Sequence, residues 1–181
     1  MLFRSGNIMR KMEFTDNRRN GYTEYYAPDG LLMYRFRFID NSLVAYAYLD
    51  KAGKFIDDIP ITPETKLIQT YYQNGKMSAK VPLQKGMYHG KFESWYASGS
   101  RLREADFVDD DSQGNETIYY ANGKVKEQAI YRFDEKDGAY RSFYENGRIY
   151  KEGQYILGNE HGEWKIYSVD GKLVEILMYN N

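Results

Sequence analysis

The sequence predicts an all-β protein, an elongated antiparallel β-meander of tandem β-hairpins that repeat every 24 residues. Two series of glycines keep this period, Asn-Gly or Asp-Gly pairs recur between apolar runs, and polar and apolar residues alternate around those pairs. The first series is Gly90, Gly114, Gly138 and Gly162, and the second is Gly75, Gly99, Gly123, Gly147 and Gly171.

Each glycine of the second series completes a turn signal. The pairs Asn74-Gly75, Asn122-Gly123 and Asn146-Gly147 favour the type I′ hairpin turn, in which both central residues have a positive φ. Asp29-Gly30 and Asp170-Gly171 follow the same pattern. We expect the first glycine series to mark the return turns between successive hairpins.

Strands are predicted on both sides of these turns. After Gly123, the residues Val125, Ala129 and Tyr131 share one face of an extended segment. Before Gly147, Tyr140 shares a face with Ser142 and Tyr144. Each repeat is therefore a strand, a tight turn and a second strand.

The chain divides into a leader at residues 1–19, which either caps the array or is disordered, and a repeat array at residues 20–181. The leader has a weak helical period over residues 1–14. One irregular repeat is expected at about residues 41–65, with a longer loop at residues 57–60. Because each repeat would contact only its neighbours, we expect no long-range contacts across a central core.

Composition excludes several functions. The 181 residues carry a net charge of −1, so no overall field attracts nucleic acid or anionic lipid. Without cysteine there is no disulfide, thiol chemistry or cysteine-based zinc site. No apolar run approaches the roughly 20 residues of a membrane span. The first residues lack a signal-peptide core, which leaves open a cytoplasmic protein or an exported one whose signal has been removed.

A ladder of aromatic residues is the main candidate binding face. One ring lies four residues before each glycine of the second series. A second set, eight residues after those glycines, includes Tyr131 and Tyr155. If that second set faces inward, the ladder lies on the opposite face of the sheet, either as cross-strand pairs that stabilise it or as a binding site. The ladder is Tyr71, Trp95, Tyr119, Phe143 and Tyr167.

Other polar residues favour structural roles. His89 and His161 are three periods apart in equivalent repeat positions, so a shared metal or a catalytic dyad is not expected. The acidic run at residues 109–111 lacks the spacing of a calcium loop and is interpreted as solvated. Arg35 and Arg37 share a strand face that would meet phosphate, an acidic partner or solvent.

The segment at residues 158–172, GNEHGEWKIYSVDGK, resembles the MORN repeat in its bacterial variant form, and residues 86–99 match it nearly as well. The resemblance covers about residues 20–181 with a weak centre. It implies an elongated curved sheet without catalytic residues of its own, which serves as a protein-interaction module or membrane-apposed scaffold. Many similar proteins resemble the YwqK family of antitoxin components.

We therefore expect a non-catalytic protein that binds another protein, with an antitoxin-like role as one form of that function. The alternative is an exported cell-surface or carbohydrate-binding repeat protein. No catalytic residue, metal or cofactor is expected, since no nucleophile lies near a plausible base and no glycine-rich phosphate loop precedes a helix. Lipid binding is not favoured, and nucleic acid is not an expected partner.

Overall fold

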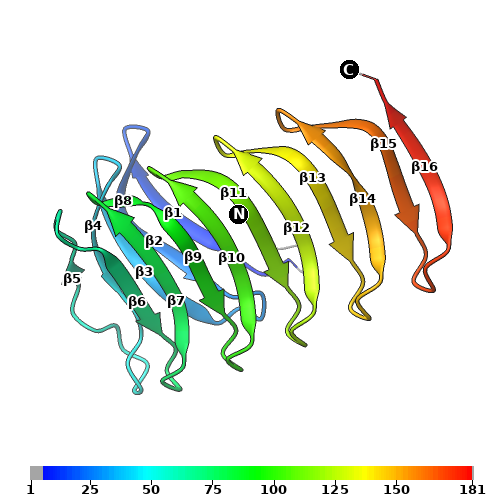
Figure 1. Ribbon diagram of the computed structural model, residues 1–181. Coiled ribbons are helices and arrows are strands. Elements are labelled where there is room, and N and C mark those ends of the chain that lie inside the picture. The colour runs from blue at the N-terminus through cyan, green and yellow to red at the C-terminus, as the bar shows by residue number, and fades with distance from the viewer. Residues whose placement is uncertain (1–5, 181) are drawn as a thin grey trace. The chain divides into compact units, whose positions relative to one another are not determined.

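The computed structural model describes residues 6–180, which contain β-strands and no helix (Figure 1). Within this range, no helix long and apolar enough to cross a membrane is found. The chain forms two compact units. Unit 1 comprises Met1–Met87 with Ser94–Gly99, and unit 2 comprises Tyr88–Glu93 with Ser100–Asn181. The all-β prediction is confirmed.

Unit 1 holds a five-stranded antiparallel sheet whose strands follow chain order. A second pair of strands, β6 and β7, is joined by the Asn74-Gly75 turn. Two further strands, β8 (Met87–Tyr88) and β9 (Gly90–Trp95), have residues in both units. The strands of unit 1 are β1 (Arg10–Thr15), β2 (Arg18–Tyr26), β3 (Leu32–Ile39), β4 (Ser42–Ala47), β5 (Ile59–Pro60), β6 (Leu67–Tyr71) and β7 (Met77–Gln84).

The core of unit 1 lies between two layers, because β3 packs against β6 and β7 (Figure 1). The Ser78 hydroxyl donates to the Met33 carbonyl at 3.2 Å and forms a 2.7 Å hydrogen bond with Thr70. Phe36 and Ile68 are fully buried. The expectation of no central core is therefore wrong for unit 1. The regular hairpin series is interrupted after β4, where only the two-residue β5 follows, and β6 and β7 then pack on β3.

The helical signal in the leader is also wrong over residues 10–15. These residues form β1, in which Met12 pairs with Thr23 of β2. Asp16 and Asn17 join the two strands with φ of 50° and 60°. Alternation along KMEFT and this Asp-Asn turn favour a hairpin over a helix. Residues 1–5 of the leader lie outside the described residues.

Unit 2 contains the regular meander that the sequence predicts. Each strand pairs antiparallel with the next in chain order, and the extensive contacts run between such neighbours. The strands after β9 are β10 (Arg101–Val108), β11 (Asp111–Tyr119), β12 (Val125–Arg132), β13 (Glu135–Phe143), β14 (Ile149–Ile156), β15 (Asn159–Tyr167) and β16 (Leu173–Tyr179).

The Asn-Gly turns are not type I′, so that prediction is wrong. At the turn between β11 and β12 the glycine Gly123 has a φ of 83°, whereas Asn122 has no positive φ. The Gly123 amide donates to the Tyr120 carbonyl at 2.9 Å, and the Tyr120 amide donates to the Lys124 carbonyl at 2.8 Å. This pattern belongs to a three-residue loop closed by a left-handed glycine, the G1 bulge.

Type I′ turns are found instead at the opposite end of the hairpins, where two consecutive residues have positive φ. Gly114, Gly138 and Gly162 lie inside strands, so the expectation that their series marks the return turns is also wrong. Each lies beside a shift in strand register. The return turns are Asp16-Asn17, Asp40-Asn41, Lys85-Gly86, Asp109-Asp110, Phe133-Asp134 and Leu157-Gly158.

Candidate interaction surfaces

Each Asn-Gly turn is joined to the next turn of the array by three hydrogen bonds that recur with the repeat. From the turn between β13 and β14, the Tyr144 hydroxyl donates to the Tyr167 carbonyl at 2.9 Å. Asn146 Nδ2 donates to the Val169 carbonyl at 3.0 Å, and Arg148 donates to the same carbonyl at 3.3 Å. The turns that begin at Tyr72 and Tyr120 make the same tyrosine and asparagine bonds, and their lysines donate to the carbonyl one residue further along. The sequence signal for this network is Tyr-x-Asn-Gly followed by Lys or Arg, a motif that the prediction of the aromatic ladder did not include.

One face of unit 2, which we call the inner face, buries an aromatic cluster. Trp164 is 0% exposed and packs against Tyr140 and Tyr155, with ring centroids 5.5 Å and 5.0 Å away. Along the middle of this face, a small residue on one strand accompanies a larger one on the next strand. The pairs are Ala105 with Glu116, Ala129 with Tyr140 and, by direct contact, Gly153 with Trp164.

Half-buried ion pairs border this cluster. Lys136 Nζ lies 2.8 Å from a Glu127 oxygen and 4.4 Å from the centre of the Tyr140 ring. One repeat later the signs are exchanged, because Lys151 occupies the position of Glu127 and Glu160 that of Lys136. Lys151 Nζ lies 2.6 Å from Glu160 and 4.3 Å from the Trp164 ring centre. The charged and aromatic side chains of the inner face thus contact one another within the chain.

The buried tyrosines of the inner face resist ionisation. Burial is the main cause that raises the pKa of Tyr140 to about 12, and nearby Glu127 adds to it. Burial likewise raises the pKa of Tyr155 to about 12, with Glu160 as the next cause. Neither ring is therefore a base or nucleophile at neutral pH, which fits a packing role.

The three ladder residues of unit 2 lie on the opposite face, which we call the ladder face. Tyr119, Phe143 and Tyr167 each follow an inner-face residue by three positions, and successive side chains in a strand alternate between faces. Their rings are half-buried. Each ladder residue pairs across the strands with an apolar residue, and these partners are Val125, Ile149 and Leu173.

Charged residues surround the ladder. The Tyr167 hydroxyl donates to Glu152 at 2.8 Å, and Arg141 lies 3.1 Å from the other oxygen of Glu152. The Tyr119 hydroxyl donates to Glu104 at 3.3 Å. Phe143 has no hydroxyl to engage a carboxylate. The ladder face therefore combines half-exposed rings with charges of both signs around them, and protein interfaces commonly have aromatic residues at the centre and polar residues at the rim.

The two ladder residues of unit 1 have their own surroundings. Tyr71 pairs with Met77 across the turn, and its ring lies 5.4 Å from that of Tyr48. Trp95 accepts a hydrogen bond at its carbonyl from the Tyr72 hydroxyl at 2.7 Å. Of the five ladder residues that the sequence predicted, two therefore belong to unit 1 and three to unit 2.

The histidines and the acidic run have local partners. His89 Nδ1 lies 3.2 Å from Asp109, while His161 pairs in register with Gln154. Asp110 Oδ1 accepts a hydrogen bond from the Tyr88 amide at 2.7 Å. Among residues 6–180, no group of three His, Cys, Asp or Glu side chains is arranged to hold a metal.

The arginines of β3 meet an acid of the same chain. Arg35 lies 3.1 Å from Asp58, and its guanidinium stacks 4.0 Å from the Tyr22 ring centre and 3.8 Å from that of Phe55. Arg37 is 3.8 Å from the other Asp58 oxygen. The expected irregular loop thus supplies the acidic partner of both arginines and fastens itself over β2 and β3.

Comparison with known protein families finds matches within unit 2. The profile of the MORN repeat variant matches residues 112–132, 136–156 and 160–181. Each match begins in β11, β13 or β15, crosses an Asn-Gly or Asp-Gly turn and ends in or just after the following strand. A comparison with curated proteins gives no match. The similarity to the MORN repeat variant is therefore confined to three consecutive hairpins in the C-terminal part of the chain.

Proposed function

We propose that the chain is a non-catalytic protein-binding module and that the ladder face of unit 2 contacts the partner. The observation that carries this proposal is that the two faces of the single-layer sheet in unit 2 differ in how far their aromatic side chains are buried. The inner face buries Trp164 completely, whereas Phe143 and its ladder neighbours stay half-exposed. MORN repeats are compatible with such a module.

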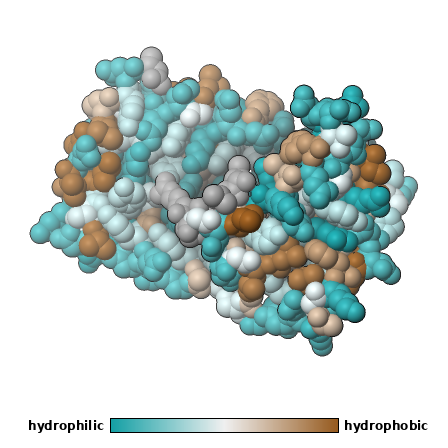
Figure 2. All heavy atoms as spheres, turned by 180° about the vertical axis from the view of Figure 1, so that it is seen from behind, coloured by the Kyte–Doolittle hydropathy of each residue, from teal (hydrophilic) through white to brown (hydrophobic). Residues whose placement is uncertain are grey.

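The surface chemistry supports a protein partner over a polyanion. Arg141, Glu152 and Lys165 lie in one cross-strand row of the ladder face, so positive and negative charges alternate there. Figure 2 shows apolar residues that reach the surface in separate patches between hydrophilic ones. Aromatic rings within mixed charge suit a protein surface, whereas a phosphate backbone requires a basic stripe.

The test is affinity measurement with a partner captured from the native host and then purified. We expect Phe143→Ala to weaken binding about tenfold or more, as for a central aromatic anchor. Val169→Ala, which truncates a 58% exposed side chain at a turn, is the matched control and should leave affinity unchanged. Unchanged affinity in Phe143→Ala would assign binding to another surface and refute this proposal.

A more specific proposal is that the partner protein is a bacterial toxin. Its support is the resemblance of residues 158–172 to variant repeats in antitoxin components. The test is co-expression with the product of a neighbouring gene that arrests growth when expressed alone. Restored growth, and its loss with Phe143→Ala, would support an antitoxin role. Continued arrest would remove that role and leave the protein-binding proposal standing.

A carbohydrate-binding surface module is the second candidate. It is favoured by Tyr119 and Tyr167, whose half-exposed rings lie beside carboxylates that can also accept sugar hydroxyls. Calorimetric titration with peptidoglycan fragments tests it. Among the two tryptophans only Trp95 can report by fluorescence, because Trp164 has no exposed surface. Absence of heat and of fluorescence change would exclude this candidate.

A further inference from the structure

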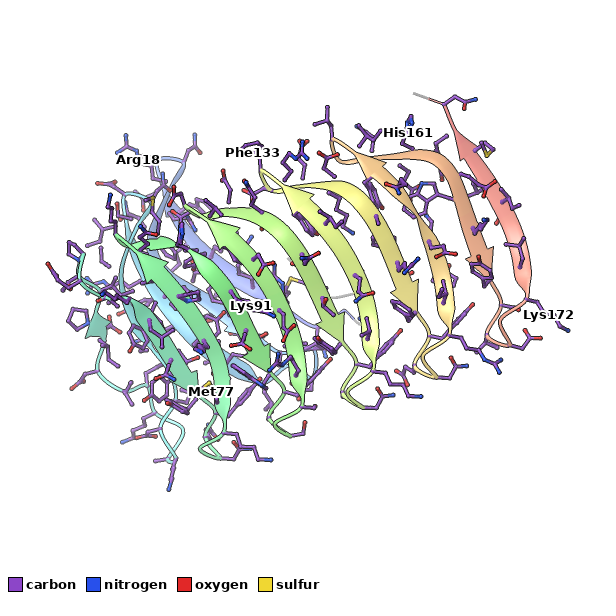
Figure 3. The ribbon with its side chains drawn as sticks, in the orientation of Figure 1. Arg18, Met77, Lys91, Phe133, His161 and Lys172 are labelled. Atoms are coloured by element: carbon purple, nitrogen blue, oxygen red, sulfur yellow. The ribbon has the colours of Figure 1, made fainter. Side chains whose placement is uncertain are left out.

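Two return turns of unit 2 display large apolar side chains. Phe133, between β12 and β13, is 67% exposed, and Leu157, between β14 and β15, is 65% exposed. They are 24 residues apart and occupy the same place in successive repeats. Figure 3 shows Phe133 at the end of its hairpin opposite to the end where Lys172 lies. Neither side chain contributes to the buried cluster of the inner face.

The backbone at both residues is strained. Phe133 has a φ of 49° and Leu157 a φ of 47°, in the left-handed region that bulky side chains rarely adopt. Four other return turns hold a polar residue at this first position, and three of these are aspartates, which tolerate the conformation better. Strained residues of this kind persist where the surrounding structure over-determines them, and they are frequent at functional sites. The equivalent residues are Asp16, Asp40, Lys85 and Asp109.

Further apolar side chains extend this edge. Ile156 is 46% exposed beside Leu157, and Val108 is 40% exposed at the return turn between β10 and β11. The three return turns belong to consecutive hairpins of one sheet. We call Val108, Phe133, Ile156 and Leu157 the apolar edge. It lies at the opposite end of β13 from Phe143, so it is a different surface from the ladder face.

The charges around the apolar edge are mainly acidic. Asp109, Asp110 and Asp111 adjoin Val108 in the sequence, and residues 134–137 next to Phe133 include three further acids. The two basic residues there, Arg132 and Lys136, pair with Asp137 and Glu127, which leaves the acidic residues in excess. Such a field repels anionic lipid and attracts basic groups.

We propose that the apolar edge docks into an apolar groove of a partner protein whose rim carries lysine and arginine side chains. Phe133 and Leu157 enter the groove as a pair of anchors. The acidic residues of the first two return turns meet the basic rim. This surface adds to the proposed ladder-face contact and does not depend on it.

Stability supplies the first test. Asparagine accepts the left-handed conformation, so Phe133→Asn and Leu157→Asn should each raise Tm, by about 2–4 °C. Val169→Asn is the control, because Val169 is exposed but has no positive φ; it should give no rise. A lower Tm in both test variants would show that the two side chains stabilise the fold, and would overturn the docking role.

Binding supplies the second test, with a synthetic amphipathic helix of leucine and lysine as the probe. Backbone amide shifts should appear at residues 132–135 and 156–159. The double variant Phe133→Asn with Leu157→Asn should weaken binding at least tenfold, and Val169→Asn should not. The proposal is overturned if the probe fails to bind, or if the double variant keeps its affinity. It is also overturned if a leucine and glutamate helix binds as well, or if phosphatidylglycerol vesicles bind through Phe133.

Discussion

Gly153 lies directly against the indole ring of Trp164. A Cβ atom at residue 153 would stand 2.3 Å from Cδ2 of that ring, closer than any real contact. Unlike the turn glycines, Gly153 has no positive φ, so its backbone would accept any residue. A glycine is required at residue 153 because the Trp164 ring occupies the space that a Cβ atom would need. One repeat earlier, Ala129 accompanies the smaller ring of Tyr140. The size of each small residue is thus matched to its neighbour.

Gly153→Ala is expected to destabilise the protein. Overpacking a well-filled site typically costs about 1–3 kcal/mol, and the indole has no free space because Trp164 is fully buried. Urea unfolding followed by circular dichroism measures this cost. Adding Trp164→Tyr recreates the Ala129 and Tyr140 pair, so the double variant should be more stable than the sum of the single effects predicts. Strict additivity would contradict the packing argument.

Removing one hydroxyl from the turn network should have a measurable effect. Tyr144→Phe deletes the hydrogen bond to the Tyr167 carbonyl and keeps the ring, so we expect a loss of about 0.5–1.5 kcal/mol. Tyr150→Phe is the control, because Tyr150 is 39% exposed and its ring packs on Tyr144. Thermal unfolding compares the two variants. Equal stabilities would mean that water replaces the lost bond.

Exchanging a charge pair should be tolerated where a single reversal is not. Glu127→Lys places two positive charges beside the inner cluster, which we expect to cost about 1 kcal/mol, the upper end for solvent-accessible pairs, at this half-buried site. Adding Lys136→Glu recreates the arrangement of Lys151 and Glu160 one repeat later. Most of the stability should then return in chemical unfolding. Continued instability would show that the ion pair alone does not define this site.

Stability should fall in strong alkali. The pKa of Tyr140 and of Tyr155 rises from 10.0 to about 12 on folding, so between these values the unfolded chain releases protons that the folded chain retains. Their contribution is constant below pH 10 and declines as the pH rises toward 12. Tyr140→Phe should reduce the slope of unfolding free energy against pH over this window. An unchanged slope would assign the loss to other groups.

The period of the sequence was sufficient to predict the hairpins, but not their turn types. Asn122-Gly123 satisfies the sequence rule for type I′, yet only Gly123 adopts a positive φ, because one more residue enters the loop. The return turns at Phe133-Asp134 and Leu157-Gly158 could not be predicted from sequence, because these residues do not resemble preferred turn pairs. The two-layer core of unit 1 was missed for another reason. It depends on contacts between β3 and β7, which no local spacing records.

For the aromatic ladder, too, the period of the sequence predicted only part of what the structure shows. Its period predicted that Tyr119, Phe143 and Tyr167 share one face, and the strands place them so. The period could not reveal that the Tyr119 and Tyr167 hydroxyls engage carboxylates, because Glu104 and Glu152 lie on neighbouring strands. Nor does it decide which surface binds a partner.

The alternation of side-chain size and charge on the inner face also favours the pairing of each strand with its correct neighbour. Were β12 to pair with β15 instead of β13, a slip of one whole repeat, Glu127 would meet Glu160. Ala129 would then occupy the space beside Trp164 that only a glycine can leave free. Tandem repeats are prone to such mispairing during folding. Non-identical copies, distinguished at these few positions, allow a nearly periodic chain to find a single register.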